Sequence, residues 1–155
     1  MSVRRELRFK TLDDARRELS ILEKGPVVTM GNWSYFQILN HCAGALEGTM
    51  KGLKREFSWW KRNVTGPLAA RKVMAQGFIP AGVKSSSPQT ERVEGDEKIA
   101  LGRLKKAMDE FETFDGPFSE HPRFGPLNKK QWIHFHAMHM ANHLGFVSLK
   151  DQENR

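Results

Sequence analysis

The segment 33–54 constrains the fold most, because apolar side chains surround most of its circumference when it is drawn as a helix. Asn32 is a suitable N-cap for this helix. The apolar positions after it are Trp33, Phe36, Ile38, Leu39, Ala43, Ala45, Leu46, Met50 and Leu53. A helix of this kind is buried on several sides, as in a helical bundle. The segment therefore predicts an all-α fold in which this helix is buried on several sides.

Other parts of the chain supply the neighbours that such a helix needs. Further helices are predicted at 11–24, 67–76, 96–113 and 129–148. Suitable N-caps precede three of them, at Thr11, Asp96 and Asn128. No alternation with the period of a strand extends beyond a few residues. The pattern predicts a four-helix bundle with a long crossover connection and an extra short helix.

The length of the chain fits a single domain, residues 1–155. Within it, residues 1–10 are expected to form an extended N-terminal arm. Residues 79–95 are rich in Pro, Gly and Ser and predict a long polar loop. Loops of this length inside one domain are commonly functional or mobile.

The composition of the chain indicates where in the cell the protein is expected. No stretch approaches the roughly 18–20 apolar residues of a membrane span, and the charged N-terminus does not resemble a signal peptide. The single cysteine, Cys42, excludes an internal disulfide and fits a reducing cytoplasm. We therefore expect a cytoplasmic protein without a membrane partner.

The net charge of +7 is unevenly distributed along the chain. Residues 1–84 hold 15 Lys or Arg against 7 Asp or Glu, a balance of +8, whereas residues 85–155 hold 10 against 11. Such a basic half can attract an anionic substrate or partner. A solvated basic surface explains the same charge without any partner.

Four histidines, His134, His136, His139 and His143, lie within ten residues of the predicted C-terminal helix. Residues four apart share one face of a helix, so His139 and His143 can point at the same place. Two imidazoles presented in this way form the usual helical half of a transition-metal site. His136 lies near the same face and His134 points elsewhere. The pair needs a third ligand from another segment.

His41 lies in the middle of the helix 33–54, beside the small residues Ala43, Gly44, Ala45 and Gly48. These small residues either let another helix approach closely or leave a hollow beside the imidazole. A single histidine on an apolar face is more often a hydrogen-bonded core residue than a ligand. The residues alone leave both roles open for His41.

Several motifs together resemble a branch of unknown function in the DinB/YfiT-like superfamily. They are the segment 32–41 ending in His41, Gly66-Pro-Leu-Ala-Ala-Arg-Lys72, Gly77-Phe-Ile-Pro80, His121-Pro-Arg-Phe-Gly-Pro-Leu127, and Trp132 followed by His136, His139 and His143. The resemblance implies a DinB-like four-helix bundle, usually a homodimer. It also implies a divalent metal, such as zinc or nickel, held by His41, His139 and His143. Asn142 replaces a histidine that is common in this branch.

Three neutral imidazoles leave coordination positions open, as in catalytic rather than structural metal sites. Neighbouring acceptors usually fix the tautomer of each ring, and His136, Asn142, Gln37 and Glu47 are candidates by their position in the sequence. The residues between His139 and His143 include no glutamate, which excludes a His-Glu-x-x-His metallopeptidase. Cys42 is expected to be a buried, inert thiol.

By resemblance, the leading hypothesis is a metal-dependent transferase or hydrolase acting on a small molecule, for example an anionic thiol. One alternative is a non-enzymatic binding or stress-associated protein with a vestigial metal site. A weaker alternative is a nucleic-acid-binding module, suggested by the net charge and by Trp59 and Trp60 beside Lys61 and Arg62.

Overall fold

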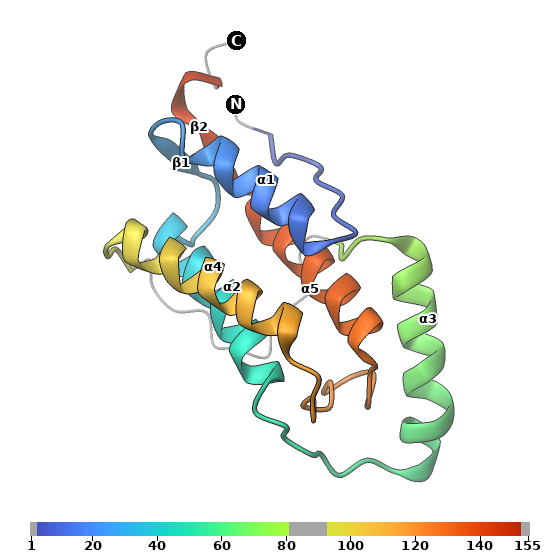
Figure 1. Cartoon of the computed structure of the whole chain (residues 1–155). Coiled ribbons are helices and arrows are strands. Elements are labelled where there is room, and N and C mark those ends of the chain that lie inside the picture. Colours follow the sequence, from blue (N-terminus) through green and yellow to red (C-terminus); the bar gives the residue numbers. More distant parts are fainter. Residues whose placement is uncertain (1–2, 81–92, 153–155) are drawn as a thin grey trace.

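Helices make up most of the computed structural model, which describes residues 3–80 and 93–152 (Figure 1). The helices in these ranges are α1 (Leu12–Leu22), α2 (Tyr35–Thr49), α3 (Gly66–Gln76), α4 (Glu97–Thr113) and α5 (Lys129–Leu144). Two short strands, β1 (Val27–Thr29) and β2 (Val147–Leu149), form a small sheet, and a π-helical turn, Lys61–Thr65, leads into α3. The all-α class predicted from the sequence is therefore confirmed apart from this sheet. None of these helices is long and apolar enough to cross a membrane.

The helix predicted to be buried on several sides has no exposed residue between Tyr35 and Thr49. α2 packs chiefly against α4 and also contacts α5, while α1 packs against α5 and α3 lies beside them (Figure 1). Fully buried side chains from these helices fill the space between them, among them Leu19, Leu39, Leu46, Leu104, Met108 and Leu144. The apolar circumference of α2 is thus explained by neighbours on more than one side.

Both ends of α2 differ from the prediction. The helix begins after Ser34 rather than Asn32, because the Ser34 hydroxyl accepts from the backbone N–H of Gln37 while the Gln37 side chain accepts from that of Ser34. It ends at Thr49 instead of 54. Beyond this point Gly52 has a φ of 66°, and the backbone carbonyls of Thr49 and Leu53 accept from residues 119 and 120. The segment after α2 therefore pairs with a distant loop.

The helix predicted at 129–148 ends at Leu144, and Val147–Leu149 instead forms a strand. β2 pairs antiparallel with β1, so that Val28 faces Ser148. Strands of three residues are too short to produce a recognisable alternation, which is why the sequence did not reveal this sheet. The other predicted features of α5, including the cap made by Asn128 and Gln131, are confirmed.

The N-terminal arm is attached to the end of α5. The backbone N–H of Arg5 donates to the Gly145 carbonyl (2.9 Å), and the Arg5 side chain donates to the Val147 carbonyl (2.7 Å) and to the carboxylate of Glu18. Most of the predicted loop 79–95 lies outside the described residues.

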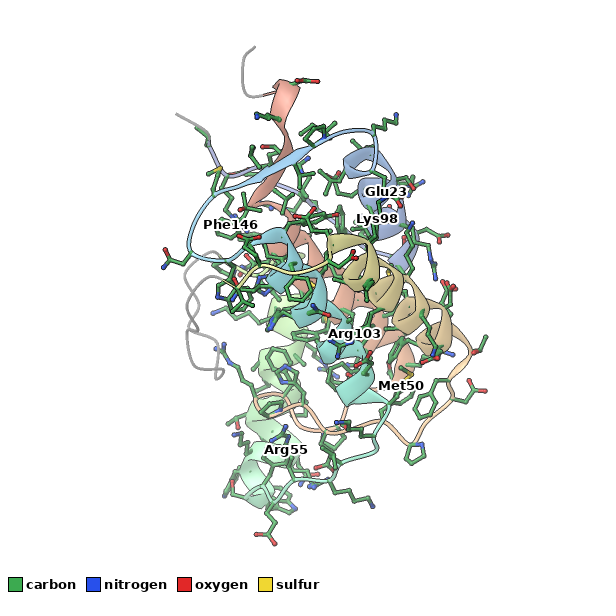
Figure 2. The ribbon with its side chains drawn as sticks, turned by 90° about the vertical axis from the view of Figure 1, so that its left-hand side faces the viewer. Glu23, Met50, Arg55, Lys98, Arg103 and Phe146 are labelled. Carbon is green, nitrogen blue, oxygen red and sulfur yellow. The ribbon has the colours of Figure 1, made fainter. Side chains whose placement is uncertain are left out.

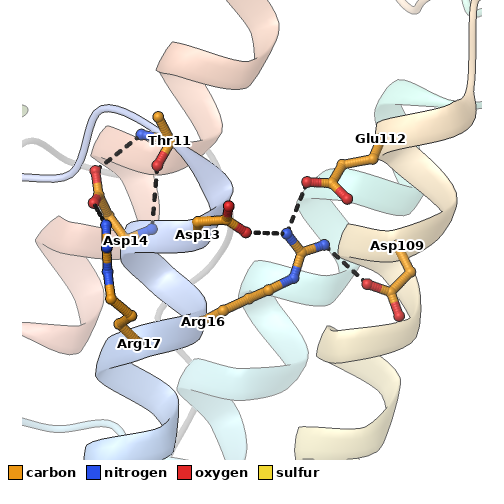
Figure 3. A network of polar contacts seen from close by, with 7 residues as sticks. All are labelled: Thr11, Asp13, Asp14, Arg16, Arg17, Asp109 and Glu112. Atoms are coloured by element: carbon orange, nitrogen blue, oxygen red, sulfur yellow. Dashed lines mark hydrogen bonds and ion pairs between the residues drawn. The ribbon is translucent and has the colours of Figure 1, made fainter.

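Polar contacts on the surface connect α1 with α4 (Figure 3). The guanidinium of Arg16 contacts Asp13 on its own helix and both Asp109 and Glu112 on α4. These carboxylates raise the pKa of Arg16 above its usual value. Exposed pairs of this kind contribute little individually, but one cation shared by three carboxylates sets how α1 lies against α4.

Candidate metal centre

Three imidazoles from two helices converge on one point. The Nε2 atom of His139 on α5 lies 3.0 Å from Nε2 of His41 on α2 and 3.1 Å from Nε2 of His143 on α5. The nitrogens that the three rings offer all lie within 4.8 Å of one another. The structure thus brings together the two histidines that the helical spacing paired and the one that the resemblance added.

Aromatic side chains hold the rings in these orientations. The Trp33 indole stacks on His143 with an interplanar angle of 4° and meets His41 edge-on, with centroids 5.4 and 4.8 Å apart respectively. Phe135 stacks on His139 with an interplanar angle of 11°. Trp33 therefore contacts two of the three histidines, a role that its helical position alone did not distinguish from ordinary core packing.

All three imidazoles are held in the neutral form. Burial lowers the pKa of His41, and burial together with the neighbouring His143 and His41 lowers the pKa of His139 well below its usual value. Burial, His41 and the Arg4 guanidinium lower the pKa of His143 to about 3. Because only a neutral imidazole has a free lone pair, each ring is ready to bind a metal near pH 7.

The geometry of the cluster fits a metal ion. Two nitrogens at about 2.1 Å from a common ion lie about 3.0 Å apart at a right angle and about 3.4 Å apart at the tetrahedral angle. The two separations that involve His139, 3.0 and 3.1 Å, agree with such an arrangement, and all three nitrogens lie within 4.8 Å of one another. Three protein ligands leave at least one position for water or substrate. The three-histidine group can therefore hold a metal ion, and its donors do not select one metal.

A cavity of about 880 Å³ opens beside the cluster, and all three histidines line it. Ala45 and Gly48 of α2 line it too, and a Cβ built on Gly48 would meet nothing within 4 Å. The small residues at these positions therefore leave a hollow beside His41 instead of letting another helix approach closely. A cavity of this volume is large enough for a small-molecule ligand.

The residues considered as tautomer-fixing neighbours have other contacts. His136 is buried and shares a 2.9 Å hydrogen bond with Thr49, while Asn142 accepts from the Arg4 guanidinium at 2.6 Å. Gln37 closes the cap of α2, and Glu47 pairs with Arg103 on α4, which lies beside α2 in Figure 2. Within the described part of the chain, none of the hydrogen bonds of His136, Asn142 or Glu47 reaches the three histidines.

Two other residues are placed as the sequence suggested. His134 lies outside the cluster and outside the cavity lining. Cys42 is 1% exposed, and burial raises the pKa of its thiol to about 12. A buried thiol that is protonated at neutral pH is a poor nucleophile.

His121 is a cavity residue that the reasoning from the sequence did not select. It precedes α5 in a loop closed by two backbone hydrogen bonds with Gly125, each 2.9 Å. The loop packs tightly on the start of α3, since a Cβ on Gly66 would lie 2.6 Å from the Phe124 carbonyl oxygen. The motif His121-Pro-Arg-Phe belongs to the resemblance, but no helical spacing connects His121 with the other histidines, and so the sequence pattern does not place it at the site.

These features define a predominantly helical protein with a three-histidine cluster on the wall of a cavity. Residues 1–150 match the family described as protein of unknown function (DUF1569), and the chain belongs to this family. The match agrees with the resemblance to a branch of unknown function. Searches among curated proteins and among solved structures find no match.

Proposed function

We propose that the protein is a metal-dependent enzyme that transfers a thiol to a small molecule or hydrolyses a small molecule in the cavity beside His41, His139 and His143. The observation that carries the proposal is the convergence of three neutral imidazoles on a cavity wall. Structural metal sites are usually closed by four protein ligands, whereas three ligands and an adjacent cavity favour a catalytic site.

His41, His139 and His143 would hold the ion, with zinc or nickel as the proposed metal. When bound, such an ion lowers the pKa of a coordinated water or thiol toward neutrality and polarises carbonyl groups. The chain itself contributes orientation and exclusion of water, because Trp33 and Phe135 fix the rings and apolar residues such as Val73 and Phe124 line the cavity.

The wider proposal includes the DinB/YfiT-like superfamily, a four-helix bundle of that type, a homodimer and a cytoplasmic location. The family of unknown function, the helical fold and the three-histidine cluster support the superfamily and the bundle. The homodimer and the cytoplasmic location are proposed from the sequence alone. In this proposal α1, α2, α4 and α5 form the bundle and α3 is the additional short helix.

The experiment uses the full chain without a polyhistidine tag, loaded with zinc or nickel. Conjugation of glutathione and cysteine to 1-chloro-2,4-dinitrobenzene and hydrolysis of nitrophenyl esters are measured with and without a chelator. We expect chelation to remove one of these activities and readdition of metal to restore it. The variant His139→Ala should be inactive, while His134→Ala on the same helix should retain the activity.

Two results would contradict the proposal. One is an activity that survives both chelation and His139→Ala, which would show chemistry without the metal. The other is stoichiometric metal binding without any activity on either substrate panel, which would favour a non-enzymatic binding protein.

A further inference from the structure

The His121 ring has a fixed tautomer. Its Nδ1 atom accepts hydrogen bonds from the backbone N–H groups of Arg123 (3.0 Å) and Phe124 (3.1 Å). An acceptor of two N–H groups carries no proton, so the proton of the neutral ring is on Nε2. Phe124 stacks against the ring at an interplanar angle of 15° and holds it in place. The loop therefore presents one N–H donor in a defined position.

This donor has no acceptor among the described residues. His121 lines the cavity, and its Nε2 forms no hydrogen bond with any described residue. The Nε1 of Trp132, whose ring centroid lies 5.7 Å from that of His121, also has no hydrogen-bond partner, but this atom is buried rather than open to the cavity. An N–H donor that is fixed on a cavity wall and has no partner among the described residues can bind an acceptor that the protein does not supply.

Three cations line the cavity: Arg55, Lys61 and Arg123. Arg55 and Arg123 lie near His121, since they add to the effect of burial in lowering the pKa of its ring. None of the three cations forms an ion pair with a carboxylate in the described parts of the chain. The one carboxylate in the lining, Glu120, is occupied by the Arg62 guanidinium and by the backbone N–H of Arg55. This end of the cavity therefore has excess positive charge. Figure 2 shows Arg55 at the opposite end of the molecule from Phe146.

A single aromatic ring separates this end from the three-histidine cluster. The Phe135 centroid lies 4.7 Å from that of His121 and 5.9 Å from that of His139. A ligand held at His121 by one end can therefore extend over Phe135 and bring its other end to the histidines.

We propose that the His121 end of the cavity binds an oxyanion, a carboxylate or a phosphate, on a small-molecule substrate. The Nε2–H of His121 donates the orienting hydrogen bond, and Arg55, Lys61 and Arg123 supply the positive charge. The inference that this ligand is a substrate rests on the proposed function, whereas the oxyanion site itself does not. The reacting group would lie at the opposite end of the same molecule, beside the three histidines.

The test is a titration of the ¹⁵N-labelled full chain with inorganic phosphate and, separately, with succinate. The side-chain N–H signals of His121 and Trp132 report binding at this end directly. The titrations use the protein as purified and after removal of metal by chelation, so that anion binding to a metal is recognised. We expect saturable shifts of the His121 signal in both forms, with the tighter of the two probes identifying a phosphate or a carboxylate.

Two variants and one control variant make the test specific. In His121→Asn the amide oxygen can replace Nδ1 as acceptor for the two loop N–H groups, while the donor at Nε2 is lost. We expect an affinity at least about tenfold weaker with an unchanged circular dichroism spectrum, as for a lost hydrogen bond to a charged group. Arg123→Gln should weaken binding by about three- to tenfold. Lys54→Gln, which removes a neighbouring charge outside the cavity lining, should have little effect.

Absence of saturable shifts at His121 with both probes would overturn the inference. So would an equal loss of affinity in Arg123→Gln and Lys54→Gln, because binding would then reflect only the general charge. If His121→Asn does not fold, the inference is still tested by the titration of the native protein and by the comparison of Arg123→Gln with Lys54→Gln. Phosphate binding without metal-dependent activity would reject the proposed function and keep the oxyanion site. Metal-dependent activity without anion binding at His121 would keep the proposed function and reject the oxyanion site.

Discussion

The Nε2 atoms of His41 and His139 lie 3.0 Å apart, although 98 positions separate these residues in the sequence. His143 reaches the same His139 atom from one helical turn further along α5. A neutral His139 ring can carry one proton on Nε2, and this proton can form a hydrogen bond with either His41 or His143 but not with both. A cation satisfies all three lone pairs at once, provided that each ring carries its proton on Nδ1. The three rings are thus arranged so that they could hold one shared ion.

Substituting His139→Ala should remove the metal site, because His139 is the ring that both other histidines contact. We expect one bound zinc or nickel per chain in the native protein and a loss of affinity of at least about a hundredfold in the variant. Elemental analysis after dialysis against a weak chelator measures the retained metal.

The matched control for this substitution is His134→Ala. His134 lies on the same helix but outside the cluster, so this variant should keep the native metal content. Equal metal content in the native protein and in His139→Ala would refute the assignment of the ligand.

The half of the site on α5 could be predicted from sequence because helical geometry is local. Once Asn128 and Gln131 marked the start of a helix, the spacing of His139 and His143 fixed their common face. His41 could not be predicted in the same way, because its contact with α5 depends on how two distant helices pack. Only the resemblance suggested it, and the structure brings the three rings together.

The missed features have the same physical origin. β1 and β2 are each three residues long and exist because the chain after Gly145 returns beside Val27. α2 is shorter than its apolar pattern because residues 119 and 120 supply hydrogen-bond partners to the segment beyond it. In both cases a tertiary contact overrides a local preference, and no local pattern contains that information.

Stability should depend on pH through the buried His136. Its Nε2 lies 2.9 Å from the Thr49 hydroxyl, which donates its own proton to the Ala45 carbonyl, so His136 is the donor to Thr49. Burial and the nearby His121 lower its pKa from 6.5 to about 3 in the folded state. In the unfolded chain His136 therefore binds a proton below pH 6.5, whereas in the folded chain it binds one only near pH 3. Stability from this group is constant above pH 6.5 and is lost as the pH falls through that window.

The variant His136→Gln keeps an N–H donor for Thr49 but does not titrate. Between pH 6.5 and 5 the free energy of unfolding of the native protein should fall by about 2 kcal/mol more than that of the variant. Urea unfolding at several pH values measures this difference in slope, which is independent of any constant loss caused by the substitution. His134→Gln, which replaces a less buried histidine, should change the slope less. Parallel pH profiles for native protein and His136→Gln would show that His136 is not held neutral.

Arg5→Ala should destabilise the fold although Arg5 lies in an arm without regular structure. The Glu18 residue is only 7% exposed, and its carboxylate is paired with the Arg5 guanidinium, which also donates to the carbonyls of Val147 and Leu144. Removing the cation leaves a nearly buried carboxylate without its partner, which costs about 3–5 kcal/mol for a fully buried pair. Because the Arg5 side chain is 27% exposed, we expect a smaller loss of about 2–4 kcal/mol.

Urea unfolding at pH 7 measures this loss, and two further variants show its cause. Arg8→Ala removes an exposed cation from the same arm, 4.0 Å from Glu6, and should cost less than about 1 kcal/mol. Adding Glu18→Gln to Arg5→Ala should restore part of the stability, since the unpaired charge is then absent. If Arg5→Ala and Arg8→Ala were equally stable, the arm would not be attached through this ion pair.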